Sequence, residues 1–410
     1  MQSKKLTGLI LIGLVLGIIT GYLYRENAAS EADIKAFASN ISILTDIFLR
    51  LIKMIIAPLV VSTLIVGIAK MGDAKTVGRI GGKTMLWFIS ASLMSLTLGL
   101  IMVNLLKPGL ALNLPLPDSH ATSGIQAGAL SLKDFITHAI PKSVFEAMAT
   151  NEILQIVVFS VFFGCAMAAL GDRAKLLIDT IDVVAHVMLK VTSYVMLFAP
   201  LAVFGAIAAT VAKEGLSILA TYGKFMAEFY LSIGILWGLL ILAGGLFIGT
   251  RVLKLMGMMR EPLLLSFTTA SSEAAYPKTL EQLERFGCSN KIASFVLPMG
   301  YSFNLDGSMM YCTFAVIFIA QAYGIDLTLA QEISMLLILM LTSKGMAGVP
   351  RASLVVIAAT LTQFNIPEAG LLLLLGIDHF LDMGRSATNV VGNSIATAVV
   401  AKWEGELKKH

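Results

Sequence analysis

The 410-residue sequence predicts an all-α membrane protein with several spanning helices. Hydrophobic residues make up 57 % of the chain and charged residues only 14 %, whereas a soluble domain is nearer half apolar and a quarter charged. Apolar runs of about 20 residues, the length of a helix that crosses a bilayer, recur from one end to the other. Polar and charged residues interrupt the apolar runs mainly after residue 260. Together these observations predict spanning helices around an internal polar site.

Six spans are expected in the N-terminal part, at about 6–24, 41–70, 82–106, 151–170, 176–212 and 217–250. The first run resembles a signal peptide, but no small-residue cleavage pattern follows it, so we expect a retained span. Lysine and arginine gather before span 1 and after spans 2, 4 and 6, whereas the loops 25–40 and 107–150 are mixed or acidic. Because basic loops stay in the cytoplasm, both termini are predicted to be cytoplasmic.

After residue 260 the apolar segments are broken by polar and helix-breaking residues. We expect a hairpin at 262–276 with its turn at 271–273, a span at 291–323 broken at 301–308, a second hairpin at 331–364 broken at 343–351, and a final helix at 367–403. Non-helical backbone at membrane depth is tolerated only where it is buried in protein or lines a cavity, so the breaks predict one shared site. A hairpin followed by an acid-bearing span occurs twice, which predicts an inverted repeat.

The final helix carries a polar stripe formed by Asp378, Asp382, Arg385, Asn389 and Asn393. At 3.6 residues per turn these five side chains project from one face. One charge at the centre of a bilayer costs about 2.5–3.5 kcal/mol on insertion scales, so the stripe must face protein or water. An internal ion pair would explain part of it, but two acids and one base leave a charge that needs a ligand. The stripe therefore predicts a substrate or ion site.

Three other charged residues stand at predicted breaks. Asp306 precedes Gly307, and a carboxylate beside freed backbone carbonyls suits a hard cation, although a hydrogen-bonded kink is the alternative. Glu273 lies at the first turn, where it could instead be the partner of a helix N-terminus. Lys344 lies at the second turn, where its ammonium would repel a cation or simply cap the turn. The three cysteines are scattered without a CxxC motif, so no metal site, disulfide or cofactor is predicted.

Several of these motifs resemble the dicarboxylate/amino acid:cation symporters, the glutamate transporter family. They are 304–308 (Asn-Leu-Asp-Gly-Ser), the serine-rich first hairpin, 345–350 (Gly-Met-Ala-Gly-Val-Pro) and 382–389. The resemblance covers essentially the whole chain. It implies eight transmembrane helices, two re-entrant hairpins, a homotrimer in the cell (inner) membrane and an elevator-type mechanism.

The resemblance also implies a division of the chain into two domains. Segments 1–81 and 107–216 would form the scaffold and the trimer contact. Segments 82–106 and 217–410 would form the transport domain, which moves across the bilayer.

In this family the position of Arg385 binds the side-chain carboxylate of the substrate, that of Asp382 binds the α-amino group, and that of Asn389 binds the α-carboxylate. A guanidinium fork matches a carboxylate, and a carboxylate is the natural partner of an ammonium group. The remaining positions that line the site are those of Ser272, Ser308, Val349, Ser353 and Ser386. Because members that carry C4-dicarboxylates tend to lack an acid at the position of Asp382, the resemblance favours L-aspartate and L-glutamate. Arg351 stands where a glycine is common in the family.

The departures from the family pattern concern the coupling ion. Sodium-coupled relatives have an acid at the position of Asn393, and a tyrosine and a threonine at those of Phe88 and Ala91, although Ser92 is kept. Lys344 would place an ammonium where another sodium binds. The chain therefore looks like the bacterial proton-coupled members.

The proton carrier must differ from that of animal relatives, whose glutamate aligns with Cys312. Glu273 and Asp306 are the leading candidates, because burial favours the protonated form of a carboxyl group. Asp378, Asn304, Asn393 and Lys344 complete the candidate coupling residues.

The resulting expectation is a secondary active symporter, not an enzyme, that imports L-aspartate or L-glutamate with protons and has no nucleic-acid partner. Sodium coupling and C4-dicarboxylate transport remain alternatives within the class. An intramembrane protease using Asp306 with Asp378 or Asp382 is disfavoured, because the Gly-x-Gly-Asp motif is absent and Arg385 would hold an acid ionised. An ion channel is a further alternative, but two hairpin gates favour alternating access.

Overall fold

The computed structural model describes residues 2–71, 74–111, 137, 139–215, 222–342 and 352–408. Within these ranges the regular structure is helical, apart from an isolated bridge between Cys288 and Leu407. Six of the described stretches are long and apolar enough to cross a membrane: Gly8–Asn27, Glu31–Ala69, Lys75–Leu110, Ile153–Glu214, Gly223–Ile248 and Asn290–Ala322. The predicted all-helical architecture is confirmed, and the apolar stretches suit a multi-pass membrane protein.

Seven of the eight predicted spans overlap these six stretches. Ile153–Glu214 contains both spans predicted at 151–170 and 176–212. The final helix, α19 (Asp378–Trp403), is long enough to span but is more polar than the six. All of its side chains from 381 to 401 are buried, so protein rather than lipid surrounds it and an apolar exterior is not needed.

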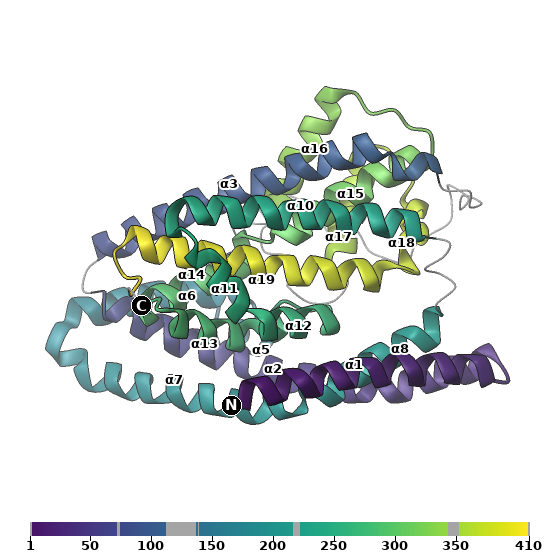
Figure 1. Ribbon diagram of the computed structural model, residues 1–410. Helices are drawn as coiled ribbons and strands as arrows, with labels where there is room; N and C mark the ends of the chain where they lie inside the picture. Colours follow the sequence, from purple (N-terminus) through teal and green to yellow (C-terminus); the bar gives the residue numbers. More distant parts are fainter. Residues whose placement is uncertain are drawn as a thin grey trace.

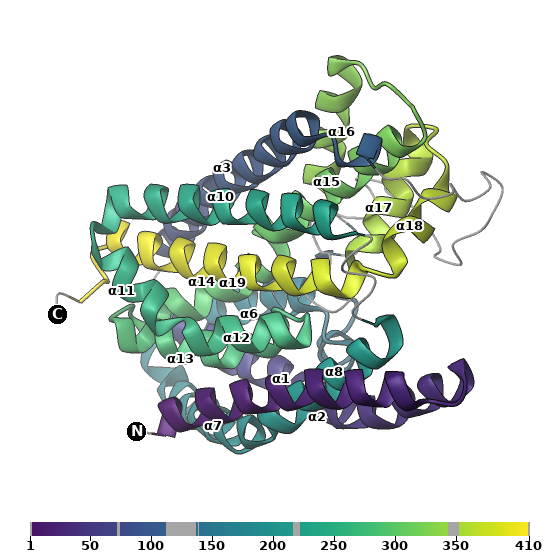
Figure 2. The ribbon, with the colours of Figure 1, turned by 45° about the vertical axis from the view of Figure 1, so that its right-hand side comes forward.

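One layer of the molecule consists of four helices that lie side by side at the bottom of Figures 1 and 2: α1 (Gln2–Asn27), α2 (Glu31–Ala69), α7 (Lys175–Val195) and α8 (Ala199–Glu214). Within this lower layer, α8 packs against both α1 and α2. Three glycines of α1, Gly13, Gly17 and Gly21, face α8. A Cβ atom at any of them would lie 2.5–2.9 Å from a backbone oxygen of α8. Small residues at this spacing let two membrane helices approach closely.

The upper group surrounds α19. Its long helices are α3 (Ala74–Leu106), α10 (Gly223–Ile248), α14 (Asn290–Phe303) and α15 (Asp306–Ala322), with the short α11 (Arg251–Met258) after α10. Each of them contacts α19 (Figures 1 and 2). The helices α5 (Val144–Thr150) and α6 (Ile153–Leu170) follow the long connection, and α6 packs against α2 on one side and α14 on the other. α6 thus joins the lower layer to the upper group.

The first hairpin consists of α12 (Arg260–Thr269) and a second arm in which η4 (Glu273–Ala275) continues into α13 (Tyr276–Phe286). The chain turns at Ala270, whose φ of 50° is left-handed. The predicted range 262–276 was wrong at its end, because the second arm continues as an amphipathic helix whose apolar face is buried.

The second hairpin is represented by its two arms, α16 (Leu329–Thr342) and α17 (Ala352–Gln363). Its predicted tip, with Lys344, Val349 and Arg351, lies outside the described residues.

The break between α14 and α15 is narrower than the predicted range 301–308. It comprises only Asn304 and Leu305. Tyr301 stays helical because its hydroxyl reaches a partner without a break, donating a hydrogen bond of 3.0 Å to the backbone oxygen of Ser272.

Two segments that were predicted as single continuous helices are interrupted. The span at 176–212 is interrupted by η3 (Met196–Phe198), because Pro200 in the first turn of α8 has no N–H to continue the helix. The helix at 367–403 is preceded by η5 (Glu368–Leu371) and α18 (Leu372–Leu375) and begins only at Asp378. A carboxylate in a first helical turn is favourable because the N-terminus carries a partial positive charge.

The far end of α19 is tied to α3 through Glu404. Its carboxylate accepts hydrogen bonds from Arg79 at 2.8 Å and from Lys83 at 2.6 Å. The hydrogen bond from Arg79, followed by that from Lys83, holds the pKa of Glu404 below its ordinary value. A lowered pKa contributes stability above the ordinary pKa, and this contribution is lost as the pH falls through the lowered value.

The glycine face of α1 yields a test of the lower layer. Gly17→Leu should overpack the contact with α8 and lower the free energy of unfolding by about 1–3 kcal/mol. Thermal unfolding of the detergent-purified protein would measure the loss. Gly8→Leu is the matched control, since nothing lies within 4 Å of its Cβ position. Equal melting temperatures for the two variants would contradict the close packing.

Candidate functional site

The polar stripe of α19 lies inside the protein, as the sequence predicted. The side chains of Asp378, Asp382, Arg385 and Asn389 are 0 % exposed and that of Asn393 is 1 % exposed. The helices α10, α12, α14 and α15 pack around α19. A site of this kind needs charged side chains that are buried but partnered, because an unpaired buried charge is very costly.

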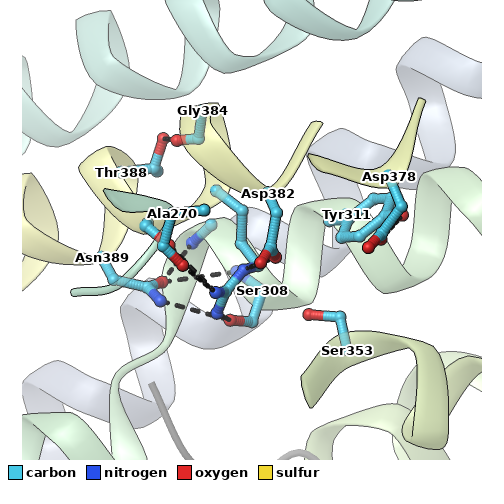
Figure 3. A network of polar contacts seen from close by, with 12 residues as sticks. Ala270, Ser308, Tyr311, Ser353, Asp378, Asp382, Gly384, Thr388 and Asn389 are labelled. Atoms are coloured by element: carbon cyan, nitrogen blue, oxygen red, sulfur yellow. Dashed lines mark hydrogen bonds and ion pairs between the residues drawn. The ribbon is translucent and has the colours of Figure 1, made fainter. Parts of the chain in front are cut away.

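The centre of the site is an ion pair between Arg385 and Asp382, in which the Nε–H of Arg385 donates to Oδ1 of Asp382. The guanidinium also donates to the backbone oxygen of Ala270 at 3.3 Å, to Oγ of Ser308 at 3.2 Å and to Oγ of Ser386 at 2.9 Å. Figure 3 shows Ala270, Ser308 and Asp382 grouped around these contacts. Arg385 therefore connects the turn of the first hairpin with the start of α15.

Asn389 holds the first turn of α15. Its Oδ1 accepts hydrogen bonds from the backbone N–H of Gly307 at 2.9 Å and of Ser308 at 3.3 Å, and its Nδ2 donates to Oγ of Ser308 at 3.2 Å. Gly307 is required at this contact, because a Cβ atom there would collide with the backbone oxygen of Arg385. The N-terminus of a helix carries N–H donors and a partial positive charge, so this turn suits a carboxylate.

Two of the predicted serines have buried hydroxyl groups without a hydrogen-bond partner among the described residues. The side chains of Ser272 and Ser353 are 0 % exposed, and their Oγ atoms have no hydrogen-bond partner among the described residues. Ser272 lies at the turn of the first hairpin. Ser353 lies at the start of α17, with its hydroxyl turned toward Ser308 (Figure 3). Since buried hydroxyls are normally satisfied, these two indicate where a polar ligand would bind.

A second polar cluster lies beside the first, around Asp306. Its carboxylate accepts hydrogen bonds from Oγ of Ser95 at 3.2 Å and from Nδ2 of Asn304 at 3.1 Å. Nδ2 of Asn304 also donates to Oδ1 of Asn393 at 3.1 Å. Oδ1 of Asn304 and Nδ2 of Asn393 have no hydrogen-bond partner within the described part of the chain. The predicted coupling residues Asn304, Asp306 and Asn393 therefore form one group.

Asp378 lies apart from both clusters, at the first turn of α19. Its Oδ1 accepts a hydrogen bond of 2.6 Å from the hydroxyl of Tyr311, and both side chains are fully buried. Figure 3 shows this pair on the far side of Asp382 from Asn389.

The family model of the sodium:dicarboxylate symporters matches residues 6–403. This chain belongs to the sodium:dicarboxylate symporter family.

Relatives in this family include proteins with two different substrate names. The proton/sodium-glutamate symport protein of Bacillus caldotenax is 40 % identical over 417 aligned residues, covering 100 % of this chain and 97 % of the relative. The C4-dicarboxylate transport protein of Laribacter hongkongensis is 41 % identical and covers 99 % of this chain and 92 % of its own. That of Bacillus subtilis is 37 % identical, with 98 % and 94 % covered. Because the identities are nearly equal, overall similarity does not separate the two substrates.

The remaining predicted residues of the symporter are placed as follows. Glu273 begins η4 at the turn of the first hairpin and is 6 % exposed. Cys312 is fully buried beside Ser353, whose backbone oxygen is 3.9 Å from its sulfur. The predicted site residues Lys344 and Val349 belong to the part of the chain outside the described ranges.

Three contributors to the site escaped the sequence analysis. Tyr311 and Ser95 are hydroxyl side chains within the membrane-length helices α15 and α3. Tyr311 follows Ser308 by three residues and Ser95 follows Ser92 by three, so a search for hydroxyls at helical spacing from the predicted residues would have found both. The contribution of Ala270 is its backbone oxygen, for which side-chain chemistry offers no signal.

The packing around Asp306 yields a test of the second cluster. A Cβ atom at Gly392 would collide with the carboxylate of Asp306. Gly392→Ala should therefore displace this carboxylate, cost about 1–3 kcal/mol of stability and abolish ion-driven uptake. Gly238→Ala on α10 is the control, because its Cβ position is open. Unchanged melting temperature and uptake in Gly392→Ala would contradict the assigned packing.

Proposed function

We propose that this symporter imports acidic amino acids, L-aspartate and L-glutamate, together with protons. The observation that carries the proposal is the buried ion pair of Arg385 with Asp382, which presents one fixed positive and one fixed negative charge to the same site. An acidic amino acid carries the complementary groups, an ammonium and two carboxylates. Each member of the pair can thus exchange its partner for a substrate group of the same charge.

The proposed roles follow from the contacts of each residue. Arg385 would bind the side-chain carboxylate, since its guanidinium is held by neutral oxygens of Ala270, Ser308 and Ser386 in addition to Asp382. Asp382 would bind the ammonium. Asn389 and the first turn of α15 would bind the α-carboxylate. The hydroxyls of Ser272 and Ser353 would complete the set, and Val349 would contribute from the second hairpin.

A C4-dicarboxylate fits this arrangement less well. When a carboxylate of the substrate binds Arg385 in place of Asp382, Asp382 would remain a buried carboxylate without a cation. Breaking a buried pair in this way typically costs about 3–5 kcal/mol. The presence of Asp382 therefore supports amino acids over succinate, fumarate or malate, which remain the alternative substrates.

Proton coupling is supported by the hydrogen bonds that Asp306 accepts. Its partners Ser95 and Asn304 are uncharged, and the position of Asn393 carries an amide. The hydrogen bonds from Ser95 and Asn304 to Asp306 involve no charged donor, whereas protonation of Asp382 would break the ion pair with Arg385. Asp306 is therefore the leading proton carrier, with Glu273 and Asp378 as the other candidates and Lys344 in a supporting role.

The proposed transport cycle is an elevator motion within a homotrimer, with both termini in the cytoplasm and the chain in the inner membrane. Segments 1–81 and 107–216 would form the static scaffold, and 82–106 and 217–410 the moving domain with both hairpins. The lower layer of α1, α2, α7 and α8 and the separate packing around α19 support this division.

Uptake into proteoliposomes tests the coupling ion. With voltage clamped by potassium and valinomycin, an inward proton gradient should drive accumulation of L-aspartate, and a sodium gradient at equal pH should not. Accumulation that follows sodium and ignores the proton gradient would establish the alternative, a sodium-coupled symporter.

Substitution of Asp382 tests the substrate. Asp382→Asn should weaken L-aspartate binding on the order of 100-fold, about 3 kcal/mol, while improving inhibition by succinate, because the uncompensated charge is gone. Competition assays against radiolabelled aspartate measure both effects. Asp179→Asn, an exposed carboxylate on α7, is the matched control. Unaltered selectivity in Asp382→Asn would remove the ammonium-binding role.

A further inference from the structure

The face of α19 opposite the polar stripe is held by two aromatic side chains of α10, Tyr230 and Trp237. α10 runs alongside α19 over most of its length (Figure 1). The contacted residues of α19 are Phe380, Gly384 and Thr388, which recur every four residues. At 100° per residue the centre of this face lies about 140° around the helix from the centre of the polar stripe.

Tyr230 contacts α19 on both sides of Asp382. Its hydroxyl donates a hydrogen bond of 2.5 Å to the backbone oxygen of Phe380, and its ring lies against Gly384. Phe380 and Gly384 are one helical turn apart and Asp382 lies between them. Tyr230 thus contacts the turn of α19 that carries Asp382.

The absence of a side chain at Gly384 permits this approach. A Cβ atom there would lie 2.9 Å from Cε1 of Tyr230 and 3.1 Å from Cδ1 of Ile233. A side chain at position 384 would push the ring of Tyr230, and with it the hydroxyl, away from the backbone oxygen of Phe380.

Trp237 provides a second contact one turn further along. Its Nε1–H donates a hydrogen bond of 2.8 Å to Oγ of Thr388, and the hydroxyl of Thr388 donates at 2.8 Å to the backbone oxygen of Gly384. Figure 3 shows Thr388 and Gly384 in contact on the side of α19 away from Ser308. This chain of hydrogen bonds encloses the next turn, which carries Arg385.

We propose that Tyr230 is a positioning residue for the ammonium site and Trp237 a positioning residue for the carboxylate site of this symporter. The proposal rests on the function proposed above for Asp382 and Arg385. Tyr230 fixes the segment from Phe380 to Gly384 and so the position of Asp382. Trp237 fixes the segment from Gly384 to Thr388 and so the position of Arg385. Binding groups must be held within about 0.5 Å of their productive geometry, which the second contact layer provides.

Substitution of Tyr230 and of Trp237 should affect binding of different substrate groups, the ammonium and the carboxylate. Tyr230→Phe keeps the ring and removes only the hydroxyl. It should raise the KM for L-aspartate about tenfold, which corresponds to about 1.4 kcal/mol, while leaving kcat and the inhibition constant of succinate unchanged. Trp237→Phe should weaken L-aspartate and succinate by the same factor, because both use the carboxylate site. Tyr222→Phe, at the residue that precedes the same helix, is the control and should change none of these values.

Uptake of radiolabelled L-aspartate into proteoliposomes, with and without succinate, measures all of these values. An unchanged KM in Tyr230→Phe would overturn the proposal, as would equal loss of aspartate and succinate affinity or a fall in kcat alone. If succinate fails to inhibit the wild-type protein, the kinetics of L-aspartate uptake alone test the proposal. A raised KM with unchanged kcat in Tyr230→Phe supports it, and a lowered kcat with unchanged KM overturns it. A wild-type protein that does not take up L-aspartate would instead contradict the proposed function.

Discussion

The buried ion pair of Arg385 with Asp382 is the constraint on which the rest of the structure depends. Taking two charges out of water is expensive, and their attraction offsets the loss only when further hydrogen bonds satisfy the remaining atoms. The fold supplies these bonds from the turn of the first hairpin through Ala270 and from the start of α15 through Ser308. Both are points where helices are interrupted. The broken helices are thus the means by which backbone and hydroxyl groups reach a charged helix in the centre of the protein.

The proposed substrate site and the proposed proton site share one turn of α15. Asn389 holds the backbone of Gly307 and Ser308, and Asp306 in the same turn holds Asn304 and Ser95. A substrate carboxylate that engages Asn389 would therefore disturb the neighbours of Asp306 directly. This arrangement offers a short physical route for coupling, without a long pathway between distant sites.

Much of this architecture could be predicted from the sequence, because charges and helix breakers in apolar sequence are conspicuous. The buried stripe from Asp378 to Asn393 and the turn of the first hairpin were predicted in this way. The start of α19 at Asp378 was missed because the preceding leucines continue the apolar pattern without a clear stop. Tyr311 was missed because its partner, Asp378, is distant in the chain. Tyr230 and Trp237 resemble ordinary aromatic residues of a span, and only the structure shows that they bond to α19.

A structure of the protein with L-aspartate bound tests the central claim most directly. The account predicts a substrate carboxylate on the guanidinium of Arg385, the ammonium on Asp382 and the α-carboxylate at Asn389, with the contact between Arg385 and Asp382 opened. A ligand bound elsewhere, or bound here with the ion pair intact and its ammonium remote from Asp382, would contradict it.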